Sequence, residues 1–345
     1  MKVSIGTKVK EGPWGGGNLF AKNLQSYLQK NGHEVVNDLS DEDIDIILIT
    51  EPRKTSESSA YTHWDVQKYL SYVNKNTIVV HRLNECDERK GTNYVNNYMM
   101  SVNKIADYTI YVSSWLRSLY EKQGLVNKDS SVILAGADKK IFNNIGFIPW
   151  NKNEKLKIVT HHWGASWKKG FDIYKELDEL IANSRWSNKI EFSYIGNLPK
   201  NFKFKNSKSI PPLSGLELAS KIKENHLYLT ASINEPSGNH HIEAAQCGLP
   251  LLFINSGGIP EYCSKYGLEF NKYNFEEKLN EIYYDYSKYQ KKVEKYPNES
   301  EKMGEEYLKI FYELLDNKDK IIKTKKLNNN LFEKYLYLSI RKISL

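Results

Sequence analysis

Short apolar runs alternate with amphipathic stretches along this chain of 345 residues. The first series of runs lies at 3–5, 44–50, 77–80, 108–113 and 132–135. The second series lies at 156–160, 190–195, 227–233 and 249–254. Each run has the length of a buried strand, and the stretches between them show helical spacing. Strands that alternate with helices predict parallel sheets, so two such series predict an α/β chain with two Rossmann-like domains.

A polar, proline-containing segment separates the two series. Residues 147–153 read FIPWNKN, which is typical of a linker. We therefore place an N-terminal domain at 1–150 and a C-terminal domain at 151–316. Residues 317–345 are rich in lysine and predict a basic amphipathic helix. Its apolar face would hold Phe332, Tyr335, Leu336 and Ile340. We expect this helix to pack on the N-terminal domain, with peripheral membrane contact through residues 318–342 as the alternative.

Composition narrows the class of protein. The chain is 40% apolar and 26% charged, as is usual for a soluble globular protein. It has no apolar run long enough to span a bilayer and no signal-peptide stretch. We expect a cytoplasmic location, with association at the inner face of the membrane as an alternative. The net charge of +7 accompanies a lysine-rich composition, and we expect no nucleic-acid partner.

The most informative stretch is 229–261, which reads LTASINEPSGNHHIEAAQCGLPLLFINSGGIPE. It predicts a strand, a polar turn, a helix over 242–247 and a second strand, the βαβ unit of a parallel sheet. Glu235 follows the strand at the edge where ligands bind in open α/β sheets. Glu243 lies in the first turns of the helix, so both carboxylates are expected to face one cleft. The free N–H groups of the helix start favour phosphate, and the whole arrangement suits a nucleotide-sugar.

The same stretch resembles a known family. Glu235 and Glu243 with seven residues between them, followed by EAAQCGLP and GGIPE, resemble the donor-site signature of retaining GT-B glycosyltransferases of group 1, the glycosyltransferase family 4-like enzymes. The resemblance implies the GT-B fold, with two facing Rossmann-like domains and a cleft between them. It also implies transfer of a sugar from a nucleotide diphosphate donor to a hydroxyl acceptor with retention of configuration, without a metal or other cofactor.

The resemblance assigns roles on the donor side. It implies that Glu243 accepts hydrogen bonds from ribose hydroxyls and that Glu235 contacts the sugar hydroxyls, so Glu235 is assigned to catalysis. The other donor-binding positions are Ser237, Gly238, Asn239 and His240 at sugar or phosphate, and Gly196 and Pro212 near the base.

The departing diphosphate gains negative charge, and in the family an arginine and a lysine of the C-terminal domain hold it. Lys169 matches the lysine and is assigned to catalysis. Trp163 stands where the arginine is usual, so Lys168, His162 or an arginine of the N-terminal domain would have to supply the second charge.

The N-terminal domain supplies the remaining candidates. Gly15, Gly16 and Gly17 lie between the first strand and the first helix, and they resemble the family loop that faces the donor diphosphate. A nicotinamide-binding loop would need Gly or Ala where Phe20 stands, although Asp38 keeps that alternative open.

The polar loop 81–89 is expected to form an acceptor and catalytic edge. His81 resembles the histidine that contacts the transferring sugar, and it is assigned to catalysis. The positions assigned to the acceptor are Arg53, Arg82 and Asn84.

Two other motifs in the sequence predict no metal site. Asp43 and Asp45 precede their strand, which is the wrong end for a metal-binding DxD motif. His161 and His162 lack a third ligand at metal spacing, so no metal site is expected. The acceptor stays open among glycan, lipid-linked and small-molecule hydroxyls. A nucleotide-sugar epimerase on the same fold and a catalytically silent nucleotide-sugar or carbohydrate-binding protein are the alternative functions.

Overall fold

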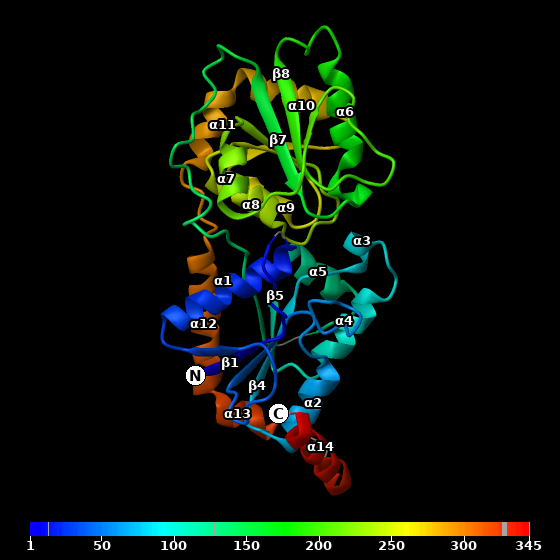
Figure 1. The fold of residues 1–345 in the computed structure, drawn as a ribbon, viewed down its shortest axis with the longest axis vertical. Coiled ribbons are helices and arrows are strands. Elements are labelled where there is room, and N and C mark those ends of the chain that lie inside the picture. The colour runs from blue at the N-terminus through cyan, green and yellow to red at the C-terminus, as the bar shows by residue number, and fades with distance from the viewer. Residues whose placement is uncertain (13, 127–128, 326–329, 345) are drawn as a thin grey trace.

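The structure is a computed structural model that describes residues 1–12, 14–126, 129–325 and 330–344. The side chains of residues 340 and 342–344 are not described. Two lobes lie one above the other in Figure 1, and each is built on a parallel sheet of six strands with helices on its faces. The two sheets correspond to the two series of apolar runs in the sequence.

The first sheet has the strand order β2-β1-β3-β4-β5-β6. Its strands are β1 (Lys2–Ile5), β2 (Glu34–Val36), β3 (Ile46–Ile49), β4 (Ile78–Leu83), β5 (Tyr108–Tyr111) and β6 (Ser130–Val132). Its helices are α1 (Gly16–Lys30), α2 (His63–Tyr72), α3 (Asp87–Lys90), α4 (Val95–Asn103) and α5 (Ser114–Lys122). All four residues of β3 are buried, because helices cover both faces of a parallel sheet.

The second sheet has the strand order β12-β11-β10-β7-β8-β9. Its strands are β7 (Leu156–His162), β8 (Ile190–Gly196), β9 (Lys208–Ile210), β10 (Leu227–Thr230), β11 (Leu251–Ile254) and β12 (Gly267–Phe270). Its helices are the 3₁₀ turn η1 (Trp167–Lys169), α6 (Phe171–Ile181), α7 (Gly215–Lys223), α8 (Asn239–Gln246), α9 (Ile259–Cys263), α10 (Phe275–Tyr284) and α11 (Tyr286–Val293).

The direction of strand addition reverses between β1 and β3 in the first sheet and between β7 and β10 in the second. Ligands of open α/β sheets bind beyond the carboxyl ends of the strands at such reversals. The loops after β1, β7 and β10 lie where the two lobes meet (Figure 1). The topology therefore brings the candidate residues of both lobes to one place.

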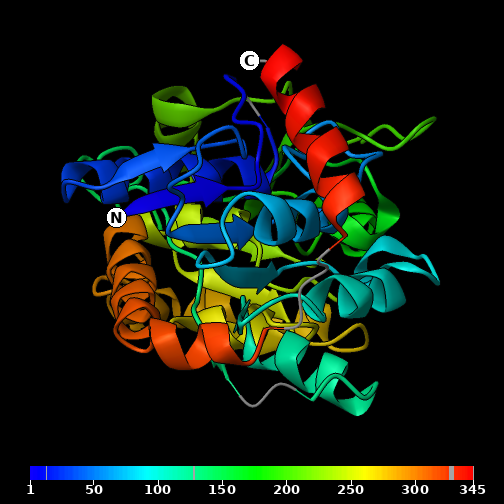
Figure 2. The ribbon, with the colours of Figure 1, turned by 90° about the horizontal axis from the view of Figure 1, so that it is seen from below.

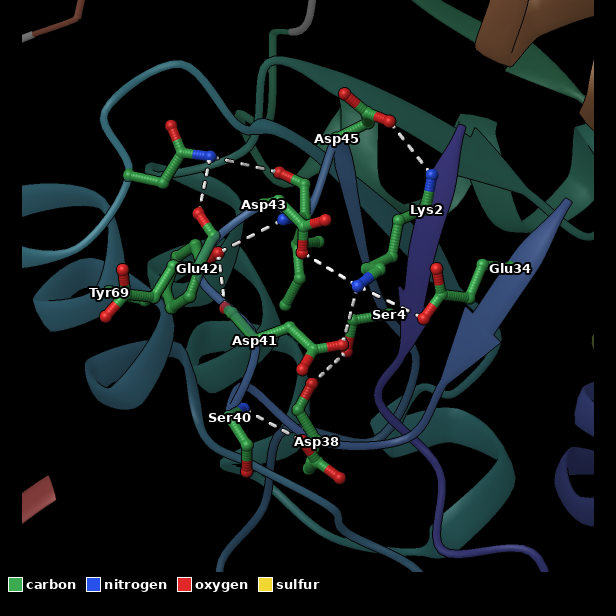
Figure 3. Close-up of polar contacts among 12 residues, drawn as sticks. Lys2, Ser4, Glu34, Asp38, Ser40, Asp41, Glu42, Asp43, Asp45 and Tyr69 are labelled. Atoms are coloured by element: carbon green, nitrogen blue, oxygen red, sulfur yellow. Dashed lines mark hydrogen bonds and ion pairs between the residues drawn. The ribbon is translucent and has the colours of Figure 1, made fainter. Parts of the chain in front are cut away.

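The opposite end of the first sheet holds a cluster of acidic side chains around Lys2 (Figure 3). The Nζ atom of Lys2 lies 2.7 Å from the carboxylate of Asp43 and 2.9 Å from that of Asp41. The backbone N–H of Lys2 donates to Asp45. Asp43 and Asp45 thus lie at the amino end of the sheet, opposite the loops that meet the other lobe. This position agrees with their rejection as a DxD motif.

The predicted domain boundaries at 150 and 316 need correction. Ala135, Phe142 and Trp150 belong to the core of the second lobe, so the chain leaves the first lobe before residue 135. Helix α12 (Ser300–Asp316) returns to the first lobe, where its buried face packs against α1 and completes that core. The buried residues of this face are Met303, Tyr307, Phe311 and Leu314. Apolar spacing predicts such a face, but it does not say which sheet the face covers.

The chain ends with α13 (Lys318–Lys323) and α14 (Leu331–Ser344) on the first lobe. Figure 2 shows α14 crossing this lobe, where it contacts α2 and Tyr72 donates to Glu333 over 2.6 Å. Phe332, Tyr335 and Leu336 are 76%, 76% and 51% exposed, so these residues of the apolar face predicted to pack are turned to solvent. The side chain of Ile340 and residues 326–329 lie outside the described part. Among the described residues, no helix has the length and apolar character needed to cross a membrane.

Candidate functional site

An ion cluster lies where the lobes meet, formed by Glu235, Lys169 and Arg89. The Oε2 atom of Glu235, in the turn after β10, accepts a hydrogen bond from Lys169 Nζ over 2.9 Å. The same oxygen lies 3.1 Å from Arg89 Nε. The three side chains are only 12%, 18% and 10% exposed. Lys169 comes from the second lobe and Arg89 from α3 of the first, so both lobes contribute to one ionic site.

The charges of the cluster do not balance. Burial acts to raise the pKa of Glu235, but Lys169 and Arg89 outweigh it and lower the pKa to about 2. Burial lowers the pKa of Lys169, against the attraction of Glu235. One carboxylate therefore faces two cationic side chains in a largely dehydrated site. A further carboxylate, that of Glu85, also attracts Lys169.

Backbone geometry holds Glu235 in place. Asn234 has φ of +52°, and its N–H donates to Ser256 Oγ over 2.8 Å. The N–H of Gly258 donates to the carbonyl of Glu235, also over 2.8 Å. A Cβ atom at Gly257 would lie 2.4 Å from that carbonyl oxygen, so the close approach requires glycine. The sequence SGGIPE thus supports the turn that carries Glu235.

Two helix starts face each other across the lobe boundary. Helix α8 begins at Asn239, earlier than the predicted start at residue 242, and Gly238 precedes it with φ of +90°. Helix α1 begins at Gly16, with Gly15 as its N-cap. A Cβ atom at Gly16 would lie 3.4 Å from the side chain of Asn239. Unpaired N–H groups and the positive ends of two helix dipoles therefore point toward one region, which favours an anion such as phosphate.

Glu243 and the histidines lie deeper in the second lobe. The carboxylate of Glu243 lies 2.8 Å from His161 Nε2, and both side chains are buried. Burial lowers the pKa of His162 and of His240 well below 6.5, so both rings are neutral at neutral pH. His162 Nε2 pairs with the Tyr174 hydroxyl over 2.7 Å. His162 is therefore not the second cation. Among the described residues, no group of three or more His, Cys, Asp and Glu side chains is arranged to hold a metal ion.

Three further residues predicted for the donor side lie at the same sheet edge. Gly196 ends β8 with φ of +135°, and a Cβ atom there would lie 1.9 Å from the carbonyl oxygen of His162. Gly196 is therefore required for close packing of β8 against β7. Pro212 follows β9 and is partly exposed. Ser237 lies in the turn before α8 and is buried.

The prediction for His81 needs correction. Strand β4 runs to Leu83, so His81 lies inside the strand instead of in the loop after it. Its side chain is fully buried, and Asn103 Nδ2 donates to its Nδ1 over 3.0 Å. Burial lowers the pKa of His81 to about 3, which keeps the ring neutral. The structure gives His81 no exposed atom that could contact a sugar.

The predicted acceptor residues differ in their surroundings. Arg53 makes two hydrogen bonds to Glu51, with Nε 2.7 Å and Nη2 2.5 Å from its carboxylate oxygens. Arg82 is buried, and its guanidinium lies 3.8 Å from the centre of the Phe20 ring. Asn84 is partly exposed just beyond β4. Arg53 and Arg82 are thus engaged within the first lobe, whereas Asn84 faces solvent in part.

The loop 81–89 contributes a residue that the sequence did not single out. Arg89 lies on the short helix α3 and reaches Glu235 in the other lobe. The signal available in the sequence was a polar loop after a buried strand, which indicated a catalytic edge but not which side chain completes it. Lys168, the other lysine considered, donates from Nζ to the Glu88 carbonyl over 2.7 Å.

Helix α9 forms a second junction between the lobes. The carboxylate of Glu261 accepts hydrogen bonds from the backbone N–H groups of Ser114 and Trp115, each over 2.8 Å. The hydroxyl of Tyr262 donates to the carbonyl of Val112 over 2.7 Å. The stretch GGIPE therefore binds the start of α5 in addition to supporting Glu235.

Comparison with known proteins relies on structure. No protein-family model matches the sequence, and no curated protein matches it. The solved structure of Anabaena Alr3699/HepE in complex with UDP-glucose is similar over 91% of this chain and 100% of that chain, with 13% identity and a TM-score of 0.67. The structure of a glycosyltransferase from Rickettsia africae ESF-5 is similar over 92% of this chain and 99% of that chain, with 16% identity and a TM-score of 0.65. The structure of sucrose-phosphate synthase from Thermosynechococcus elongatus is similar over 91% of this chain and 99% of that chain, with 14% identity and a TM-score of 0.63. With its two facing Rossmann-like sheets, the chain has the GT-B fold.

Proposed function

We propose that this protein is a glycosyltransferase that moves a sugar from a nucleoside diphosphate-sugar to a hydroxyl acceptor. The observation that carries the proposal is the meeting of Glu235, Lys169 and the start of α8 at the strand reversal of the second sheet, opposite the start of α1. Along the chain the start of α8 lies between Glu235 and Glu243, which suits a ligand with phosphates between two sets of hydroxyls. Alr3699/HepE, which has a similar fold, binds UDP-glucose.

In this proposal each group of the donor has its own partner. Glu243, oriented by His161, accepts hydrogen bonds from the ribose hydroxyls. Glu235 accepts hydrogen bonds from hydroxyls of the sugar. The backbone N–H groups at the start of α8 hold the phosphates together with the N–H groups at the start of α1. Partly exposed Asn84 contacts the acceptor from the first lobe.

Transfer proceeds with retention of configuration. The acceptor oxygen bonds to the anomeric carbon on the face from which the diphosphate departs. The electron pair of the broken bond goes to the diphosphate, whose oxygen takes the acceptor proton. Lys169 stabilises the charge that develops on the diphosphate, so the reaction needs no metal. Positioning and electrostatic stabilisation supply most of the rate.

The test begins with a thermal-shift screen of nucleotide-sugars, because a ligand that binds the folded state raises its melting temperature. The best donor is then incubated with hydroxyl acceptors of each class, with and without EDTA, and NMR determines the anomeric configuration of the product.

Lys169→Ala and Glu235→Ala should abolish transfer. Lys175→Ala is the matched control, because Lys175 is an exposed lysine on α6. Its Nζ atom lies 3.8 Å from the carboxylate of Glu179 on the same helix. Normal turnover in both site variants would show the proposal to be wrong. Donor conversion without an acceptor, or donor binding without turnover, would likewise contradict transfer.

A further inference from the structure

We propose that Arg89 is the second cation of the diphosphate site and that the first lobe delivers it across the lobe boundary. This inference rests on the proposed function and names a residue that completes its site. The expected arginine of the second lobe is replaced by Trp163, which is 45% exposed and lies against Trp14 with ring centres 6.3 Å apart. The second lobe thus has Lys169 in place but lacks the cation expected at position 163.

Arg89 occupies the position that such a cation needs. Its Nε lies 3.1 Å from the carboxylate oxygen that also accepts the hydrogen bond of Lys169. The two cations therefore flank one atom, as they would flank an oxygen of a phosphate. Among the described residues, Arg89 contacts Glu235 through Nε and its two Nη groups donate no hydrogen bond, so these groups are available for a planar, two-pronged contact with phosphate.

The second lobe also holds the backbone beside Arg89. The carbonyl oxygen of Glu88 accepts a hydrogen bond from Lys168 Nζ over 2.7 Å and one from Asn234 Nδ2 over 3.3 Å. Lys168 precedes Lys169, and Asn234 precedes Glu235. Lys168 and Asn234 thus hold the backbone next to Arg89. They act on Arg89 through this backbone and are positioning residues.

The first lobe anchors α3 from the other side. The carboxylate of Asp87 accepts hydrogen bonds from the Thr92 hydroxyl and from the N–H groups of Val95 and Asn96, over 2.5 Å, 2.9 Å and 3.0 Å. Arg89 is therefore carried by a short helix that is tied to α4. A guanidinium that is held in this way needs little reorganisation to meet developing charge, which is the condition under which electrostatic stabilisation is strong.

The origin of Arg89 in the first lobe has a consequence for catalysis. The cation pair exists only while the two lobes are in contact, because separating them removes Arg89 from Lys169. Departure of the diphosphate is therefore stabilised only in the closed molecule, where water is excluded. Closure of the lobes and completion of the catalytic charge are one event.

The experiment compares Arg89→Gln with Lys169→Ala and with a control, Arg117→Gln. Arg117 pairs with Glu121 on the surface of α5 and is 40% exposed. Isothermal titration with UDP, GDP and ADP, each beside its monophosphate, measures the diphosphate contribution to binding. Arg89→Gln should weaken binding of the preferred diphosphate about 10- to 100-fold, as expected for loss of a charged hydrogen bond, with a smaller effect on the monophosphate. It should lower kcat about 10²- to 10³-fold.

Two further measurements separate a direct role of Arg89 from a structural one. Arg89→Lys keeps the charge and should retain part of the diphosphate affinity. Added guanidinium ion should restore part of the transfer activity of Arg89→Ala, which a loss of structure would not allow. These variants also serve if Arg89→Gln fails to fold.

The outcomes distinguish the two proposals. If Lys169→Ala loses diphosphate binding and transfer while Arg89→Gln keeps both, the assignment of Arg89 is wrong and the proposed function stands. If neither substitution changes binding or transfer, or if no diphosphate binds the unchanged protein, the proposed function fails together with it. Equal losses in Arg89→Gln and Arg117→Gln would show an effect of net charge and overturn the assignment.

Discussion

Glu261 offers a direct measure of how strongly the two lobes hold each other. Its carboxylate accepts hydrogen bonds from the N–H groups of Ser114 and Trp115, which begin α5 in the other lobe. The hydroxyl oxygen of Ser113 accepts a hydrogen bond from the N–H of Leu116 over 3.2 Å. Glu261 therefore binds the other N–H groups at the start of the helix. We expect Glu261→Gln to loosen the junction, because the amide lacks the negative charge that the helix start favours.

The size of the effect follows from these contacts. A helix cap contributes about 1 kcal/mol, and a charge at a helix terminus adds about 0.3–1 kcal/mol. Glu261 is exposed, so screening by solvent reduces the second figure. Glutamine keeps one acceptor oxygen and hence part of the cap. We therefore expect a loss of about 1 kcal/mol, which is a factor of about 5 in the equilibrium between closed and open molecules.

Small-angle scattering and diphosphate titration both report this equilibrium. Glu261→Gln should increase the radius of gyration, and it should weaken diphosphate binding wherever closure is incomplete. The effect should diminish in 1 M salt, where exposed charges are screened. Glu121→Gln removes a carboxylate that pairs with Arg117 within the same helix α5, and it should change neither quantity. Unchanged scattering and binding in Glu261→Gln at low salt would refute this account of the junction.

Three other predictions concern stability and surface contact. Ionised Glu235 adds stability above pH 4.5, and this stability is lost as the pH falls toward 2. In urea titrations, the difference in free energy of unfolding between the unchanged protein and Glu235→Gln should therefore shrink over that range. A constant difference would contradict the ion cluster. Gly196→Ala should lower the free energy of unfolding by at least ~2 kcal/mol, whereas Gly17→Ala, which has open space, should not. Replacing Phe332 and Tyr335 by serine should reduce sedimentation with anionic vesicles, and equal binding would remove the membrane contact.

The sequence predicted the fold well because strands of a covered parallel sheet are apolar throughout. The runs at 44–50 and 249–254 contain β3 and β11. The starts of α1 and α8 were placed too late, since both helices begin with small or polar residues that carry no apolar spacing. Glycine before a helix can mark either a loop or a cap, and only the backbone angles distinguish them.

The positions of the residues predicted for the donor side follow from the sequence more directly than those of their surroundings. Glu235, Glu243 and Lys169 follow strands of one sheet, so spacing along the chain carries information about their positions in space. Arg89 is distant from Glu235 in sequence, and no local pattern pairs the two. His81 was misplaced because a histidine at the end of an apolar run reads as the first loop residue. The structure shows that β4 continues two residues beyond it.

The stretch 229–261 has two physical tasks that cannot be separated. Its residues form the proposed donor site, and they also make polar contacts to the first lobe, from Asn234 to Glu88, from Glu235 to Arg89 and from Glu261 to α5. A donor that draws Arg89 and Lys169 onto its phosphates alters the contacts that hold the lobes together. By linkage, the factor by which the donor shifts the equilibrium of lobe closure equals the factor by which closure changes the affinity for the donor. Closure is therefore a part of the binding energy of the donor.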